Sequence, residues 1–413
     1  MARFPAFLSR SRLAAVSALA VLIACAAYGA ATSAAASKTT RATSIRVVDY
    51  YAFEPDKTIV GGVLNACGKS VGVKIKRDAI PGANLIQKVL QMASSRTLPD
   101  VLMLDNPDLQ QFAQSGALTP LGNYGISAKG YQKGVVAAST YKRKLYGLQP
   151  ITNSIALFYN KDILAKAGVT PPKTWAELRA DAKKLTSGNT YGLALSAPAN
   201  YEGTWQFMPF MWSNGGDERN IATPQVAAAL QLLVDLKSDG SMSPSVVTWS
   251  QGDVNDQFKA GNAAMMVNGP WQFPVLNSIT SLHYGVVPIP VPRAGGVPVA
   301  PLGGETWTVP NTGKTAQEQL AAKVVQCLNS DKNQLLLGKK RQVVPTKLAL
   351  LPQFVRANPA LKAFSTVVKT ARARTGELGA NWPKAATKIY TAEQCALTGQ
   401  GTPEKCLAQA QNG

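Results

Sequence analysis

The sequence predicts an α/β protein whose chain is divided between two lobes, and three observations carry this prediction. The chain has 413 residues, which is long for a single hydrophobic core. Its first part alternates expected strands and helices, an order typical of a parallel sheet with helices on both faces. Residues 144–178 then combine a turn, an extended crossing, a strand and two capped helices. This stretch indicates that the chain leaves one lobe and enters the other.

An export signal occupies the start of the chain. Three arginines precede an apolar run over residues 13–27, and small residues follow it. The run contains Leu-Ile-Ala-Cys, which fits a lipobox in which Cys25 would be lipidated after cleavage. Cleavage by ordinary signal peptidase after residues 34–36, or retention as an anchor, are the alternatives. We therefore expect a signal peptide over 1–24 and a flexible tether over 25–44.

Export bears on where the protein is located and on whether its other cysteines form disulfides. We expect a lipoprotein on the outer face of the cell membrane, or alternatively a soluble periplasmic or secreted protein. Such compartments are oxidising. Cys395 and Cys406 flank a short turn-rich loop, so we expect a local disulfide between them, whereas Cys67 and Cys327 either pair or stay as buried thiols. With one histidine and no close cysteine or histidine pairs, we expect no metal site and no cofactor.

The net charge of +20 is large for a chain of this length. It could reflect nucleic-acid binding, attraction to anionic polymers of the cell envelope, or a solvated basic surface. Lysine and arginine are spread along the chain, with one tight cluster at residues 339–341, and export argues against a nucleic-acid partner. The pattern favours a solvated basic surface, and it leaves an acidic ligand open.

The first lobe begins with an alternation of strands and helices. Strands are expected over 45–48, 71–75 and 101–104, and helices over 56–67 and 85–93. Ligands of such sheets bind beyond the carboxyl ends of the strands. Asp105 directly follows a fully apolar strand and is the best candidate, while Asp49 and Asn106 fit capping or turn roles equally well.

The crossing into the second lobe begins at Pro150, which has no backbone N–H to donate. An apolar strand over 154–159 follows, and Asn160 is placed to cap the next helix. Thr174 and Glu177 have the spacing of a capping box at the start of another helix.

An aromatic segment follows the next expected strand, which covers residues 191–195. Trp205 and Trp212 are seven residues apart and lie on one face of a helix. Trp205 comes soon after the loop over 197–203, so we assign it to a ligand site and leave Trp212 in the core.

Two further segments complete the regular part of this region. A proline-capped helix over 224–238 and a short helix over 254–260 lead to a buried strand over 263–267. Trp271 follows that strand directly after Asn-Gly-Pro, where a pocket would lie. Another strand is expected over 284–288.

The remainder of the chain returns to the sheet and then becomes mostly helical. Gly303 and Gly304 allow close approach of the backbone to a ligand, and Glu305 can accept hydroxyl hydrogens before the strand over 307–309. The C-terminal region is helical except for a loop over 371–383 that contains Arg372 and Arg374 among its polar residues.

Several blocks together resemble one known family. They are LPDVLMLDNPDLQQFAQSGALTPL, KLYGLQPITNSIALFYNKDILAKAGVTPPKTWAEL, FKAGNAAMMVNGPW, PLGGETW and ALTGQGTPEKCL. Their order and spacing are similar to those of the bacterial extracellular solute-binding proteins of carbohydrate ABC importers, the group that includes maltose-binding protein. The Cys395–Cys406 pair departs from the usual pattern of this family.

The resemblance implies a two-lobed periplasmic-binding-protein fold of type II, with mostly parallel sheets and three hinge crossings near Asn153, Asn268 and Thr306. Lobe 1 would comprise 45–152 and 268–306, and lobe 2 would comprise 153–267 and 307–413. A ligand would bind between the lobes and be enclosed by hinge bending. The residues implied as ligand contacts are Glu54, Asp105, Asn153, Trp205, Trp271, Gly304, Glu305 and Arg374. Arg372 is an alternative match to Arg374.

The function implied by the resemblance is sugar binding for an ABC importer, by a monomer that delivers its ligand to the membrane permease and catalyses no reaction. Tryptophan faces suit the apolar faces of a pyranose, and carboxylates, amides and arginine suit its hydroxyl groups. One alternative is an anionic ligand such as a glycerol phosphodiester, a sugar phosphate or a uronate. The other is a secreted glycosidase using two carboxylates among Glu54, Asp105 and Glu305.

Overall fold

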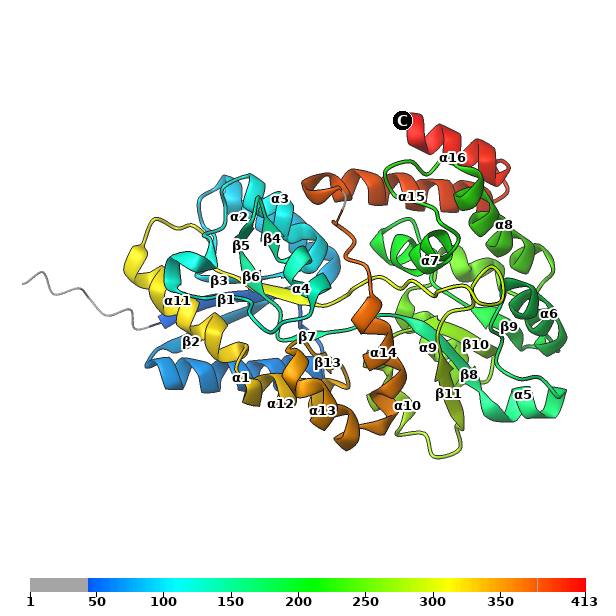
Figure 1. Cartoon of the computed structure of the whole chain (residues 1–413), viewed down its shortest axis with the longest axis horizontal. Helices are drawn as coiled ribbons and strands as arrows, with labels where there is room; N and C mark the ends of the chain where they lie inside the picture. The colour runs from blue at the N-terminus through cyan, green and yellow to red at the C-terminus, as the bar shows by residue number, and fades with distance from the viewer. Residues whose placement is uncertain (1–43, 377) are drawn as a thin grey trace, which may run out of the picture. The chain divides into compact units, whose positions relative to one another are not determined.

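The computed structural model describes residues 44–376 and 378–413, and its strands form two main sheets with helices packed against them (Figure 1). The α/β prediction is therefore confirmed. The expected signal peptide, Cys25 and the expected tether up to residue 43 lie outside the described residues. Ser44 already belongs to the first strand. Within the described part of the chain, every helix is too short or too polar to cross a membrane.

The first sheet has the strand order β2-β1-β3-β12-β6. Its strands are β1 (Ser44–Asp49), β2 (Lys74–Ala79), β3 (Val101–Asp105), β12 (Glu305–Thr308) and β6 (Gly147–Leu148). β1 runs parallel to β2 and β3, and β12 runs antiparallel to β3 and β6. Apart from Asp105, β3 is fully buried, as expected for a central strand covered on both faces.

The second sheet has the order β11-β8-β10-β9. Its strands are β11 (Tyr284–Val287), β8 (Ala156–Asn160), β10 (Ala263–Asn268) and β9 (Tyr191–Ala194). β8 is antiparallel to both neighbours, and β10 is parallel to β9. The predicted caps are confirmed: Asn160 accepts hydrogen bonds from two backbone N–H groups, and Thr174 with Glu177 forms a capping box.

Helices connect and cover the two sheets. The α-helices are α1 (Asp56–Val71), α2 (Gly82–Ser94), α3 (Leu109–Gln114), α4 (Lys133–Ala138), α5 (Lys161–Ala167), α6 (Trp175–Leu185), α7 (Tyr201–Ser213), α8 (Pro224–Ser238), α9 (Gln251–Lys259), α10 (Phe273–Leu276), α11 (Thr315–Leu328), α12 (Asp331–Arg341), α13 (Leu351–Ala357), α14 (Lys362–Thr370), α15 (Trp382–Leu397) and α16 (Pro403–Asn412). The 3₁₀ turns are η1 (Asn106–Asp108), η2 (Leu121–Tyr124), η3 (Pro244–Val247), η4 (Pro270–Gln272), η5 (Leu348–Leu350), η6 (Pro359–Leu361) and η7 (Gly379–Asn381). Short two-residue strands are β4 (Thr140–Tyr141), β5 (Lys144–Leu145), β7 (Ile151–Thr152) and β13 (Val344–Pro345).

The membership of the lobes differs from the expected ranges. β11 pairs with β8, so residues 284–287 belong to the second sheet and not to lobe 1. β12 pairs with β3, and α11 and α12 pack on α1, so residues 305–341 belong with the first sheet and not with lobe 2. The physical reason is strand pairing between segments far apart in sequence, which local patterns do not specify.

The segments that cross between the lobes also differ from expectation. The crossing near Asn153 is present, but Asn268 ends β10 inside the second sheet. The chain returns at Gly303, which forms a β-bridge with Asn153, and leaves again through β13, which pairs with β7. Residues 371–375 add a further segment between α14 and α15, because Ala371 and Ala373 join the core of the first lobe.

The crossing strands are held together by side-chain hydrogen bonds to their backbones. The carbonyl of Gly303 accepts bonds of 2.8 Å from Gln149 Nε2 and from Thr152 Oγ1. Ser154 Oγ donates to the carbonyl of Pro301 at 2.7 Å. These bonds are buried, so the crossing strands form one well-connected hinge region.

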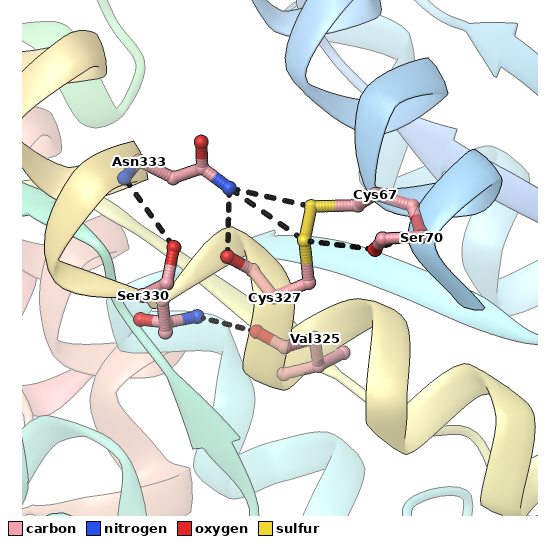
Figure 2. The surroundings of a disulfide bond; sticks show 7 residues. Cys67, Ser70, Val325, Cys327, Ser330 and Asn333 are labelled. Atoms are coloured by element: carbon pink, nitrogen blue, oxygen red, sulfur yellow. Dashed lines mark hydrogen bonds between the residues drawn. A yellow bond between two sulfur atoms is a disulfide. The ribbon is translucent and has the colours of Figure 1, made fainter.

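Two disulfides join helices within the lobes. The expected Cys395–Cys406 bond is present and joins α15 to α16. Cys67 and Cys327, for which the sequence left two possibilities, are also paired and join α1 to α11 (Figure 2). Figure 2 shows Asn333 beside this bond, with its Nδ2 donating to the carbonyl of Cys327 at 2.8 Å.

Candidate functional site

A cleft of about 450 Å³ lies between the two sheets, and the residues that line it come from both lobes. The eight side chains and backbone positions implied by the resemblance all line this cleft: Glu54, Asp105, Asn153, Trp205, Trp271, Gly304, Glu305 and Arg374. The structure therefore brings together residues that are spread over more than three hundred positions in the sequence. Their role as ligand contacts remains a prediction.

The polar floor of the cleft is formed by the ends of strands in the first sheet. β12 is antiparallel to β3, and the register pairs Glu305 with Asp105. The start of one strand therefore lies beside the end of the other, which places two carboxylates at the same edge of the sheet. Asp105 keeps about a third of its side chain exposed and lines the cleft.

Arg374 connects this edge to the second lobe. Its Nη2 donates to Asp105 Oδ1 at 2.8 Å and to Asn106 Oδ1 at 3.2 Å. Its guanidinium lies 4.5 Å from the ring centroid of Trp205, so it also stacks on the helix α7. Arg374 is 4% exposed, so its side of the ion pair is buried, whereas Asp105 is partly exposed.

The alternative match, Arg372, lies elsewhere. Its Nη2 donates to Glu218 Oε1 at 3.0 Å, and its guanidinium lies 4.7 Å from the Trp212 ring centroid. Arg372 does not line the cleft. The structure thus assigns the cleft position to Arg374, and Trp212 is buried in the core as predicted.

A second buried network surrounds Glu305. Tyr50 donates its hydroxyl hydrogen to Glu305 Oε1 at 2.5 Å, and Arg341 Nη1 lies 3.6 Å from Glu305 Oε2. Arg341 also makes two bonds of 2.8 Å to the carboxylate of Asp56. Burial raises the pKa of Tyr50, and the negative charge of Glu305 raises it further, so the phenol stays protonated and acts as a donor.

Sequence reasoning missed Arg341 because it belongs to the basic cluster at residues 339–341 that was assigned to the surface. The structure shows that Arg341 is 6% exposed and lies against the ring of Tyr51, with 4.3 Å between the guanidinium and the ring centroid. Local sequence offers no signal that separates Arg341 from Lys339 and Lys340, because its partner Asp56 is distant in the sequence.

The hinge contributes the backbone side of the cleft. A Cβ atom on Gly303 would lie 1.9 Å from Asn153 Oδ1 and 2.7 Å from Trp205 Cη2. Gly304 has φ of +117° and would place a Cβ 2.1 Å from Gln149 Nε2. Both positions therefore require glycine. The side-chain amide of Asn153 makes no hydrogen bond to another described residue and is available to a ligand.

The second lobe supplies the aromatic and acidic wall. Trp271 follows β10 on η4 and is half-buried at the cleft. Glu202 lies in the first turn of α7, which Asn200 caps, and its Oε2 accepts a bond of 3.0 Å from the backbone N–H of Gln251. Sequence reasoning missed Tyr201, Glu202 and Gln251 as lining residues. The helix start after β9 was the signal that could have found the first two.

Glu54 lies at the rim of the cleft and not in its interior. Its carboxylate accepts bonds of 2.8 Å from Thr58 Oγ1 and 3.2 Å from the Thr58 backbone N–H. The adjacent Phe53 is 71% exposed at the same rim. The first loop therefore presents an acidic and an aromatic side chain at the mouth of the cleft.

The electrostatic balance of the cleft is acidic. Five lining residues carry carboxylates and three carry cationic groups: Glu54, Asp56, Asp105, Glu202 and Glu305 against Lys340, Arg341 and Arg374. Behind this wall, burial raises the pKa of Asp108 to about 7, with a further increase from Asp105 and an opposing effect of Arg374. Among the described residues, no group of histidine, cysteine or carboxylate side chains is arranged to hold a metal ion.

Comparison of the sequence with known proteins identifies relatives along most of the chain. Residues 63–363 match the profile of the family described as bacterial extracellular solute-binding protein. A putative binding protein of Brucella abortus is 28% identical over 353 residues, which cover 82% of this chain and 84% of the relative. A galactooligosaccharide-binding protein of Bacillus subtilis is 25% identical over 86% of both chains. A maltooligosaccharide ABC transporter solute-binding lipoprotein of Streptococcus pneumoniae is 24% identical over 73% of this chain and 72% of the relative.

Solved structures show the same fold. An ABC transporter solute-binding protein of Thermotoga lettingae bound with α-D-tagatose has a TM-score of 0.80 at 22% identity, over 90% of this chain and 98% of that one. Maltose-bound MalE3 of T. maritima also has a TM-score of 0.80, at 24% identity over 89% of this chain and 98% of that one. The expected two-lobed type II binding-protein fold is thus confirmed, but the expectation of mostly parallel sheets is wrong, because β8 and β12 each run antiparallel to both of their neighbours.

Proposed function

The chain belongs to the bacterial extracellular solute-binding proteins, and from this premise we propose that it captures a neutral sugar or oligosaccharide for an ABC importer. The permease in the membrane would be its partner, and the ligand would bind in the cleft between the lobes. Relatives of this chain are named for galactooligosaccharide and maltooligosaccharide binding, which supports the substrate class.

The observation that carries the proposal is the composition of the cleft wall. Trp205 and Trp271 lie among the carboxylates Asp105 and Glu202 and the amide of Asn153. A pyranose has apolar C–H faces and a rim of hydroxyl groups, so flat aromatic rings and charged acceptors suit its two kinds of surface.

Charge pairing in the cleft favours a neutral ligand over an anionic one. Arg374 is already bonded to Asp105, and Arg341 is already bonded to Asp56 and lies near Glu305. A phosphate or uronate would compete with these carboxylates and would face an acidic excess. Lys340 is the remaining cationic lining residue, and it lies at an exposed position.

Closure of the two lobes around a ligand supports tight binding and requires no catalysed reaction. The aromatic wall belongs to the second lobe, and the Asp105 edge belongs to the first, so a ligand held by both stabilises the closed form. We propose binding without turnover, as in the relatives, which are named as binding proteins. Incubation of bound oligosaccharide followed by product analysis tests this, and released fragments would contradict it.

A thermal-shift screen over neutral sugars, sugar phosphates and uronates tests the substrate class. We expect only neutral saccharides to raise the melting temperature, and calorimetry then gives their affinity. Replacing Asp105 by Asn is expected to weaken binding about tenfold or more, because a charge-assisted bond becomes a neutral one. Asp256→Asn is the control, since Asp256 is exposed on α9 and does not line the cleft. A shift produced by anionic sugars alone would contradict the proposal.

The location of the mature chain is extracytoplasmic, as the family implies, and we propose that a lipid on Cys25 holds it at the membrane. The relative in Streptococcus pneumoniae is named a lipoprotein, which supports this. In cells grown with labelled palmitate, the protein is expected to carry the label and the Cys25→Ser variant to lack it. Label that persists in that variant would exclude Cys25 as the lipidated residue.

A further inference from the structure

The hairpin formed by β4 and β5 projects three consecutive basic side chains that the proposed sugar site does not use. Thr140 pairs with Leu145 and Tyr141 pairs with Lys144, so Lys142 and Arg143 form a two-residue turn. Lys142, Arg143 and Lys144 are all exposed, and none of them lines the cleft.

The backbone of this turn is unusual for the residues that occupy it. Lys142 has φ of +45° and Arg143 has φ of +63°, as the favoured two-residue hairpin turn requires. Such turns ordinarily carry Asn-Gly or Asp-Gly, because these residues adopt positive φ at little cost. A turn that keeps two long cationic residues in this conformation departs from the local optimum for folding.

The charge of the hairpin is not compensated by its surroundings. No described carboxylate lies within ion-pair distance of Lys142, Arg143 or Lys144, although Lys142 Nζ lies 5.5 Å from the ring centroid of Tyr141. The sequence contains no aspartate or glutamate from residue 109 to residue 161, a stretch with six lysines and arginines. This stretch of the sequence therefore carries a net positive charge.

Two tyrosines flank the basic tip. Tyr141 and Tyr146 are half-buried on the two sides of the hairpin, with ring centroids 6.5 Å apart. Tyrosine rings with one apolar side and one polar end are enriched where a protein meets the headgroups of a membrane. Basic residues beside such rings are better suited to a lipid surface than to a dissolved polyanion. A polyanion could be bound by charge alone and would leave the rings without a role.

We propose that the β4–β5 hairpin binds the anionic phospholipid headgroups of the membrane that the extracellular chain faces. Each lysine or arginine near an anionic leaflet contributes about fivefold in partition coefficient, so the three together contribute roughly a hundredfold. The inference uses the extracellular location of the family and does not depend on which ligand the cleft holds.

The test uses the purified chain with Cys25→Ser, which has no lipid anchor of its own, and sedimentation with vesicles. This chain is expected to bind equimolar phosphatidylcholine–phosphatidylglycerol vesicles and not pure phosphatidylcholine vesicles, with weaker binding at high ionic strength. A triple variant with Lys142→Gln, Arg143→Gln and Lys144→Gln is expected to lose roughly a hundredfold in partition coefficient.

A matched control removes the same charge from another exposed part of the first lobe: Lys69→Gln, Lys74→Gln and Lys76→Gln. This control is expected to retain most of the vesicle binding. An equal loss in both triple variants, or equal binding to neutral vesicles, would overturn the proposal. Melting temperature and sugar affinity are measured on both variants, so that misfolding or failure of the sugar assignment is recognised separately.

Discussion

At the scale of single residues, Arg374 joins three parts of the chain that are distant in sequence. It bonds to Asp105 and Asn106 at the end of β3, and it stacks on Trp205 of α7. Only a planar guanidinium combines such stacking with directed hydrogen bonds. Arg374 therefore fixes the orientation of a carboxylate and a tryptophan that we propose as sugar contacts.

Replacing Arg374 by Gln is expected to lower the free energy of unfolding by about 1–3 kcal/mol, because the bonds to a charged partner are lost. Urea denaturation measures this change. The control is Arg356→Gln on α13, which removes an exposed arginine outside the cleft. An Arg374 variant with the urea midpoint of wild type would show that the ion pair contributes nothing to stability.

Glu393 is a second residue whose environment affects stability, because its burial lowers the free energy of unfolding when the carboxyl group is ionised. It is 1% exposed, and neither carboxylate oxygen has a hydrogen-bond partner. Burial raises the pKa of Glu393 well above its usual range. A carboxyl group with a raised pKa in the folded state contributes full stability below its unfolded pKa and loses that contribution as the pH rises through the folded pKa.

The isosteric change Glu393→Gln is thus expected to stabilise the protein at pH 8, by about 1–3 kcal/mol, and to have a smaller effect at pH 5. Thermal unfolding at the two pH values measures the difference. Glu404→Gln on α16 provides an exposed control. A gain that is equal at both pH values would contradict the pH argument.

At the scale of elements, the β4–β5 hairpin carries a conformational cost in its turn. Left-handed backbone costs about 1–2 kcal/mol per residue for side chains other than glycine, with asparagine better tolerated. Lys142→Asn combined with Arg143→Gly is therefore expected to raise the free energy of unfolding by roughly 1–2 kcal/mol. Denaturant titration measures this gain. The same variant should bind anionic vesicles less well, so stability and surface binding would change in opposite directions.

At the scale of the whole molecule, the two disulfides constrain the chain to different extents. Cys67–Cys327 closes a loop with a sequence separation of 260, whereas Cys395–Cys406 has a separation of 11. The entropy of the unfolded chain falls more when the closed loop is longer, and the entropic contribution grows slowly with length.

Replacing Cys67 and Cys327 by Ala is expected to cost about 5–6 kcal/mol, against about 3 kcal/mol for Cys395 and Cys406. Urea unfolding of the two double variants, under oxidising conditions, compares these losses. The reverse order would show that local strain or residual structure, and not loop length, decides the contribution.

Local sequence patterns were sufficient to predict some strands, some helix caps and some residues that line the cleft. The buried strand before Asp105 and the caps at Asn160 and Thr174 were predicted from neighbouring residues, and the structure confirms them. Asp105 and Trp271 were placed at strand ends by the same reasoning, and both line the cleft.

Features that depend on contacts between segments far apart in the sequence could not be predicted from neighbouring residues. The assignment of β11 to one sheet and β12 to the other depends on hydrogen-bonded partners more than a hundred residues away. Arg341 looked like one member of a surface cluster, because its partners Asp56 and Glu305 are distant in the sequence. Burial of a charge is decided by such partners.

The late return of β12 to the first sheet has a consequence for the order of synthesis. β3 is completed at residue 105, but its second neighbour begins at residue 305, after most of the other lobe has been made. Throughout this interval the growing chain has one edge of its first sheet unpaired, and Arg374 follows later still. Because β3 cannot gain its second neighbour before β12 has been made, we expect the second sheet to be largely synthesised before the first sheet is complete.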